Sequence, residues 1–177
     1  GYGLLTLVMQ ARVNGGGEAN IEPGFDTMIK KVAPNVLAWE PSPGKMAQMM
    51  QTGEAPLVVW GNGRVQSVAD QGAPVEFVYP REGAPVIMVA ACVTEGAPQP
   101  RLGQQFLQHI VSPEVQAQMA QVLAWGPVSK KAQITPDVAR KVVYGPQQVA
   151  ALVAPDYSII NAKRAEWTQR WNRAVEK

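Results

Sequence analysis

The amino-acid sequence predicts an α/β protein whose strands and helices alternate through the first half of the chain. Strands are predicted where β-branched, aromatic and other apolar residues gather between glycine- and proline-rich turns, at 57–60 (LVVW), 75–79 (VEFVY) and 86–93 (VIMVAACV), with a shorter one at 36–39. The runs 57–60 and 86–93 are continuously apolar, which is typical of strands buried on both faces of a mixed or parallel sheet. Segments with apolar residues at three- and four-residue spacing separate the strands, so a sheet packed between helices is expected.

Helix boundaries follow from local signals. Ser42, Ser112 and Thr135 each precede a proline, and a polar cap followed by proline at the first helical position favours a helix start. Asp156 is expected to start the last helix, which carries Trp167 and Trp171 on one face. The full set of predicted helices covers about 4–12, 23–32, 43–52, 65–71, 102–110, 113–122, 136–143 and from 156 onward.

Composition excludes several classes of protein. The chain has 177 residues, of which 46% are hydrophobic and 17% charged, with a formal net charge of +2. These values predict a globular chain that buries a core and exclude a disordered one. No run of Lys or Arg exceeds two residues, so the basic face that nucleic-acid binding needs is not expected. The longest apolar run, 86–93, is far shorter than the roughly 20 residues of a membrane span, and no signal peptide is expected in a sequence that opens without a basic region.

Catalytic and metal-binding motifs are missing from the sequence. The single histidine, His109, falls in a predicted helix and is expected to be a surface or packing residue, and Cys92 lies in an apolar run that predicts a buried, inert thiol. The Gly61-Asn62-Gly63 turn lacks the third glycine of a dinucleotide site, and Asp137 and Asp156 are interpreted as helix-start residues. We therefore expect a binding protein rather than an enzyme, with no cofactor and no bound metal.

The order of segments resembles the extracellular solute-binding proteins of ABC importers, in particular the branch with spermidine/putrescine- and iron-binding members. The pieces that carry the resemblance are, in chain order, 20–25 (NIEPGF), 53–56 (GEAP) leading to Trp60, 72–83 (GAPVEFVYPREG), 112–116 (SPEVQ) and 161–164 (NAKR) with Trp167 and Trp171. Each piece alone is a weak signal, and their order and spacing together are specific.

The resemblance implies a type II periplasmic binding protein-like fold with two lobes, here lacking most of the N-terminal lobe. Residues 1–84 and 131–177 would form the second lobe, and 85–130 would be an excursion into the first. The implied function is the periplasmic substrate-binding component of an ABC importer, which captures a small-molecule solute and delivers it to the membrane permease. Without the first lobe, the apolar strand 86–93 would expose an edge prone to pairing with another copy of the chain.

The resemblance also suggests which residues line the solute cleft. Ligands of α/β sheets bind beyond the carboxyl ends of strands, which points to Trp60, Gly61 and Asn62; the alternative for Trp60 is that it fills the core. Trp125, just before Gly126-Pro127, is a further candidate because relatives present an aromatic residue to the cleft at this place. Further candidates are Glu82, which would meet a cationic group or else pair with Arg81 or a backbone amide, and Tyr2, which stands before a helix whose free amides suit an anion.

Two departures from the family pattern bear on the solute. Polyamine binders carry a Trp and, two residues on, an Asp at the places of Ile87 and Val89, and the adjacent tyrosines of iron binders are not found. A small zwitterionic or anionic metabolite is therefore expected over a polyamine or ferric iron. An α/β enzyme domain or a sensor domain, with its functional residues on the absent part, is the alternative.

Overall fold

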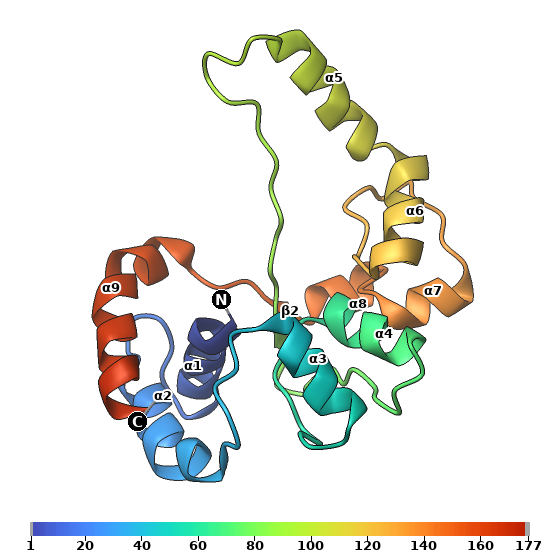
Figure 1. Cartoon of the computed structure of the whole chain (residues 1–177). Coiled ribbons are helices and arrows are strands. Elements are labelled where there is room, and N and C mark those ends of the chain that lie inside the picture. The colour runs from blue at the N-terminus through green and yellow to red at the C-terminus, as the bar shows by residue number, and fades with distance from the viewer. Residues whose placement is uncertain (1, 176–177) are drawn as a thin grey trace.

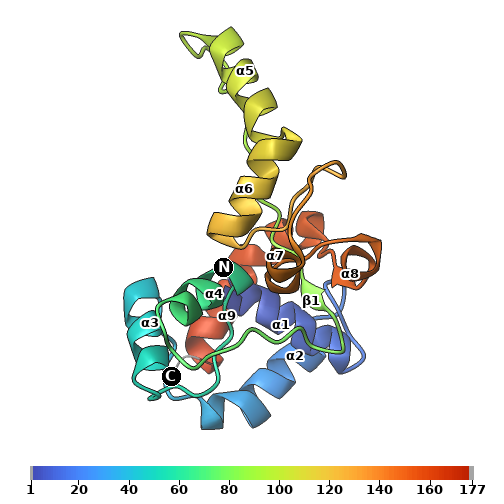
Figure 2. The same ribbon diagram turned by 90° about the vertical axis from the view of Figure 1, so that its right-hand side faces the viewer.

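The computed structural model describes residues 2–175, in which helices form a broad lower body and a long arm rises from it (Figure 1). The lower body contains α1 (Tyr2–Val13), α2 (Glu22–Thr27), α3 (Pro43–Gln51), α4 (Asn62–Asp70), α7 (Pro136–Lys141), α8 (Pro146–Ala150) and α9 (Tyr157–Ala174). The arm consists of an extended segment that leads to α5 (Pro100–Ile110) and returns through α6 (Pro113–Leu123). Figure 2 shows α5 and α6 following one another along this arm.

The two ends of the chain share the largest core. Helices α1, α2 and α9 pack together around a buried cluster, and Figure 1 shows the blue and red ends of the chain side by side. Helix α2 continues as a π-helical turn, η1 (Met28–Val32), and a 3₁₀ turn, η2 (Ala33–Asn35). The buried residues of this core are Leu7, Val8, Ala11, Ile21, Phe25, Met28, Ile160, Trp167 and Val175.

Two smaller cores lie in the rest of the lower body. One joins α3 to α4 through Met50, Val65 and Val68, and partly buried apolar residues of 58–60 and 73–77 pack against it. The other joins the end of α6 to the segment around α7 through Ala120, Ala124 and Val142. Parallel strands β1 (Ala84–Pro85) and β2 (Leu152–Val153) form a two-residue ladder that links the middle of the chain to the segment before α9.

The predicted strands 36–39, 57–60, 75–79 and 86–93 were wrong for this structure. Within residues 2–175 the only sheet is the β1–β2 pair, and those four segments run outside any ladder. A strand needs a neighbour that accepts and donates its backbone hydrogen bonds, and the described residues supply none there. Cys92 is exposed rather than buried for the same reason, because the segment that carries it has no covering layer.

The helix-start signals were read correctly. The Ser42 hydroxyl accepts a hydrogen bond from the Lys45 backbone N–H at 3.4 Å, and the Thr135 hydroxyl does the same for Val138 at 3.4 Å. The Asp156 carboxylate accepts from the backbone N–H groups of Ser158 (2.9 Å) and Ile159 (3.4 Å) at the start of α9. No helix within residues 2–175 is long and apolar enough to cross a membrane.

A buried carboxylate ties α1 to α9. Glu18 receives hydrogen bonds from two nitrogens of the Arg12 guanidinium, at 2.7 and 3.1 Å, and from the Asp156 backbone N–H at 2.9 Å. Burial by itself raises the pKa of Glu18, but these hydrogen bonds to the ionised form outweigh it, so the pKa lies below its ordinary value. A second contact joins α2 to α9, where Arg170 donates two hydrogen bonds to Glu22 and lies 4.0 Å above the Phe25 ring.

We predict that Glu18→Gln lowers the free energy of unfolding at pH 7 by about 1–3 kcal/mol, the usual effect of removing a charged hydrogen-bond acceptor from a buried network. Because the folded-state pKa is lowered, the carboxylate stabilises the fold above its ordinary pKa, and this stability is lost as pH falls through the lowered value. The difference between wild type and variant should shrink in acid. Denaturant unfolding across pH measures it, with Glu166→Gln in the exposed Lys163 pair as the control. Equal effects from both substitutions would contradict the prediction.

Large apolar side chains are exposed along 57–60 and 86–93, two of the segments that were predicted to be strands. Leu57 is 90% exposed, Met88 75% and Val89 68%. Contiguous exposed apolar surface marks a site of association, and extended backbone without a ladder partner can pair with another chain.

We therefore expect the 177-residue chain on its own to self-associate at micromolar concentration. The double substitution Met88→Lys with Val89→Lys should shift it toward the monomer, because charge on an edge opposes pairing. Leu37→Lys is the matched control, since Leu37 is 62% exposed but lies outside this surface. Light scattering coupled to gel filtration reads the mass, and a monomeric wild-type chain would refute the expectation.

Candidate ligand-binding site

A wide hollow of about 3080 Å³ opens between α1, the segments 50–67 and 74–91, and the chain from the end of α6 to residue 130. Small-molecule pockets usually measure about 300–1,000 Å³, so this hollow is several times too large to enclose one small ligand. Most of its lining residues are apolar. The hollow is therefore an open surface rather than a closed ligand pocket, and we call its lining the wall.

All six residues expected at the cleft, Tyr2, Trp60, Gly61, Asn62, Glu82 and Trp125, line this one hollow. Five of them meet around the start of α4, and Glu82 lies in the turn before β1. Glu82 is half-exposed and faces Arg81 at 4.0 Å, the long edge of an ion pair. The structure thus places together residues that lie more than 120 positions apart in the sequence.

Gly61 and Gly63 allow the other segments to approach the start of α4. A side-chain carbon at position 61 would lie 2.6 Å from the Tyr2 hydroxyl oxygen, so the tyrosine occupies the space that any other residue would need. At position 63 the same carbon would lie 2.6 Å from the Leu123 carbonyl oxygen and 3.4 Å from the Trp125 ring. That second contact involves backbone, which cannot swing aside as a flexible side chain can. Glycine is therefore required at 63 for α6 to end where it does.

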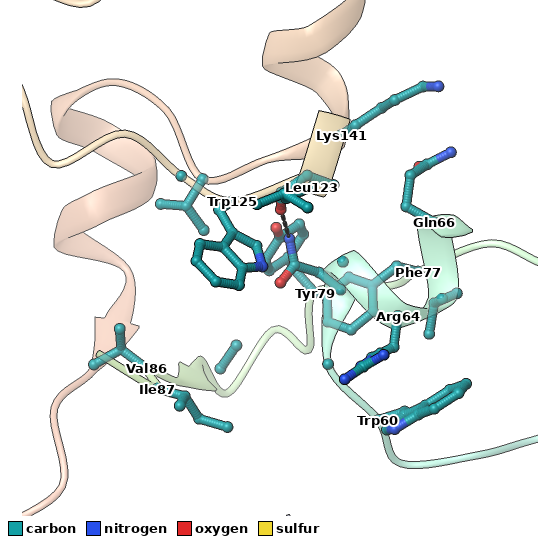
Figure 3. A pocket seen from close by; sticks show the side chains of 18 of the residues that line it. Trp60, Arg64, Gln66, Phe77, Tyr79, Val86, Ile87, Leu123, Trp125 and Lys141 are labelled. Carbon is teal, nitrogen blue, oxygen red and sulfur yellow. Dashed lines mark hydrogen bonds between the residues drawn. The ribbon is translucent and has the colours of Figure 1, made fainter. Parts of the chain in front are cut away.

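Asn62 lies between these two glycines and makes a hydrogen bond within the protein. Its side-chain Nδ2 donates to the Ala124 carbonyl oxygen at 2.8 Å, across 62 residues of sequence. Figure 3 shows this bond beside Leu123 and Trp125. One N–H of the Asn62 amide, a residue predicted to lie at the solute cleft, is thus bonded within the chain itself.

The sequence left two alternatives for Trp60, lining a solute cleft or filling the core. It is half-buried, packs against the core of α3 and α4, and lines the hollow. One face of the indole therefore supports the fold, and the remainder is available to the hollow. Trp125 is 44% exposed on the opposite side of α4's first turn.

Sequence reasoning missed three residues of this wall. Arg64, in the first turn of α4, is exposed and takes part in none of the ion pairs among residues 2–175. Phe77 and Tyr79 stack edge to face with ring centroids 4.9 Å apart, and partial burial raises the pKa of the Tyr79 hydroxyl. Figure 3 shows all three with Trp60 around the hollow. The alternation of Phe77 and Tyr79 was a usable signal, since residues two apart on an extended chain share a side.

Apolar residues also line the side of the hollow formed by 85–91. Ile87 and Val89, which stand where polyamine binders carry a Trp and an Asp, line the hollow as well, and Figure 3 shows Ile87 with Val86 across from Trp60. Among residues 2–175 no group of three His, Cys, Asp or Glu side chains is arranged to hold a metal ion. His109 is exposed on α5, and Asp137 and Asp156 stand at helix starts as interpreted.

Comparison with solved structures shows the same fold in several proteins. An ABC transporter substrate-binding protein from Bradyrhizobium japonicum USDA 110 is 24% identical with a TM-score of 0.75, over 96% of this chain and 55% of that one. An ABC transporter structure from Clostridium perfringens ATCC 13124 is 22% identical with a TM-score of 0.71, over 96% and 54%. The PBP AgtB from A. tumefaciens R10, in complex with agropinic acid, is 22% identical with a TM-score of 0.68, over 99% and 56%.

The chain thus spans about half the length of these structures. No curated protein matched it by sequence. The family model described as bacterial extracellular solute-binding protein matches residues 23–144, which is more than half of the chain. Its members bind solutes and do not catalyse reactions, which removes the enzyme alternative. The chain therefore belongs to the bacterial extracellular solute-binding protein family.

Proposed function

We propose that this chain forms one wall of a two-lobed periplasmic receptor that captures a small solute and hands it to the permease of an ABC importer. The observation that carries the proposal is the wall itself. Two indoles, a stacked phenylalanine and tyrosine, and an arginine with no ion-pair partner among residues 2–175 line a hollow too large to enclose a small molecule. A second wall would reduce the hollow to the volume of a ligand pocket.

The proposed lobes follow the division expected from the resemblance. Residues 1–84 and 131–177 build one lobe, which here contains the core shared by α1, α2 and α9. Residues 85–130, the arm, contribute to the other. Helix α5 supports this assignment because none of its residues is buried, while Leu102 and Phe106 are 59% and 60% exposed. Such a helix needs another layer to cover its apolar side.

Among the charged groups that line the hollow, Arg64 favours a solute with a carboxylate group. Arg64 offers a planar guanidinium that suits bidentate carboxylate binding, and no acidic side chain pairs with it among residues 2–175. Ile87 and Val89 offer nothing to an ammonium group. Glu82, which pairs only at long range with Arg81, is placed to meet the amine of a zwitterion. AgtB was solved with agropinic acid, also an acid, which agrees with this class of solute.

A thermal-shift panel on the natural full-length protein tests the solute class. Agropinic acid and small amino acids should raise the melting temperature, by mass action on the folded state, while spermidine and putrescine should not. Arg64→Gln should abolish the carboxylate shift. Arg173→Gln is the matched control, because Arg173 is also exposed and in none of the ion pairs among residues 2–175, but lies near the end of α9 and does not line the hollow. A polyamine shift at micromolar concentration, unmatched by any carboxylate, would overturn the proposed class.

Trp60→Ala should weaken binding of whichever panel solute shifts the melting temperature most, by about 1–3 kcal/mol, the usual loss of an aromatic contact with its buried area. Calorimetry measures the affinity and unfolding measures the fold. Trp39→Ala serves as the comparison: Trp39 packs edge to face on Trp171 with centroids 5.1 Å apart, away from the hollow. It should lower stability and leave affinity unchanged. The opposite pattern, in which Trp60→Ala binds normally, would show that Trp60 only fills the core.

A further inference from the structure

Two parts of the chain meet at the first two residues of α4. The Asn62 side chain holds the Ala124 carbonyl at 2.8 Å. Gly63 lies directly beneath the Leu123 carbonyl and the edge of the Trp125 indole, since a side-chain carbon there would lie 3.4 and 3.5 Å from Cδ1 and Nε1 of that ring. The start of α4 thus contacts and supports residues 123–125 (Figure 3).

Ala124, whose carbonyl Asn62 binds, has a strained backbone. Ala124 ends α6 with φ 50° and ψ 39°, and it is the only residue other than glycine with positive φ within residues 2–175. The left-handed conformation costs an L-residue roughly 1–2 kcal/mol, and such residues persist where their surroundings fix them. Ala124 is buried against Ala120 and Val142, and its carbonyl is bound by Asn62. This turn sets the direction in which the chain leaves α6, and Trp125 is the next residue.

We propose that Asn62 is a positioning residue for Trp125 and does not itself contact the solute. By holding the Ala124 carbonyl, its amide fixes the left-handed turn and thereby the indole on the wall of the hollow. This role rests on the proposed function only in taking Trp125 as part of the solute-binding wall. It differs from the expectation from sequence, in which Asn62 binds the solute directly, because one N–H of its Nδ2 is bonded to the Ala124 carbonyl and this bond fixes the orientation of the amide.

The bond also joins the two parts of the chain that we assign to different lobes. Asn62 belongs to the segment 1–84, and Ala124 to the segment 85–130 that leads into the other lobe. A single amide therefore fixes the indole relative to Trp60, which directly precedes the same turn. Affinity for a solute held between both indoles depends on that separation.

The first test needs no solute. In Asn62→Asp the side chain keeps its shape but presents an oxygen to the Ala124 carbonyl in place of a donor, and Asn62→Ala removes the group altogether. Acrylamide quenching of tryptophan fluorescence is measured in the wild type and in each Asn62 variant, and again in each of them with Trp125→Phe. The difference between the two measurements gives the quenching of Trp125 alone. Its quenching should rise about twofold, because an indole that is 44% exposed can little more than double its exposure. Asn14→Asp is the matched control, since Asn14 donates an equivalent bond to the Gln10 carbonyl at 2.8 Å, far from Trp125.

The second test is a double-mutant cycle in the full-length protein, with agropinic acid as the probe. Asn62→Ala should weaken binding about 2- to 12-fold, the factor that corresponds to one net hydrogen bond. In the Trp125→Ala background the same substitution should have no further effect. Ala124→Gly, which relieves the strain and keeps the carbonyl, should leave both the quenching and the affinity unchanged.

Two results would overturn the proposal. One is quenching of Trp125 that does not change in either Asn62 variant. The other is an equal loss of affinity from Asn62→Ala with and without Trp125, which would mean that Asn62 contacts the solute itself. If agropinic acid does not bind at all, the solute class is wrong, while the quenching result still decides the role of Asn62.

Discussion

The packing of α9 back onto α1 and α2 is the constraint on which the site depends. Ile160 and Trp167 of α9 share the core with Leu7 and Phe25, and Glu18 links the end of α1 to the start of α9 through the Asp156 backbone. With α1 fixed in this way, Tyr2 at its beginning is held against Gly61. Gly61 leads into α4, whose first turn contacts the end of α6 through Asn62 and Gly63. The position of Trp125 thus traces back, contact by contact, to a helix at the far end of the chain.

Close approach replaces sheet pairing in this part of the molecule. The described residues contain one ladder of two residues per strand, too short to hold the lower body together. Glycine at 63 lets the Leu123 carbonyl come within a distance that no other residue would allow, and a single side-chain bond from Asn62 completes the junction. Such a junction is compact but involves few groups. It can therefore be specific in geometry without contributing much area to stability.

The sequence predicted what is local and missed what depends on distant partners. Ser42, Thr135 and Asp156 were identified as helix starts because a cap bonds to amides two or three residues away. The strand at 86–93 was predicted from apolar residues that would suit a buried sheet, yet a ladder requires a neighbour far away in sequence, and so Met88 and Cys92 are exposed. The six candidate site residues line one hollow, and their contact with a solute stays a prediction. Arg64 was missed because a single charged residue in a helix forms no sequence motif. Its place in the lining of the hollow depends on segments that are distant in sequence.

The same distinction explains why the sequence predicts a position for Asn62 and does not predict its hydrogen-bond partner. A polar residue at the carboxyl end of an apolar run is expected at a ligand site, and that expectation concerns position alone. The role depends on where the amide donor points, which the backbone of Ala124 decides. That backbone is left-handed although alanine gains nothing locally from it, so the conformation has to be maintained by groups around it. The Asn62 amide and the buried contacts of Ala120 and Val142 are those groups, and the residue they place at the hollow is an indole, the side chain best suited to cover a small solute without charge of its own.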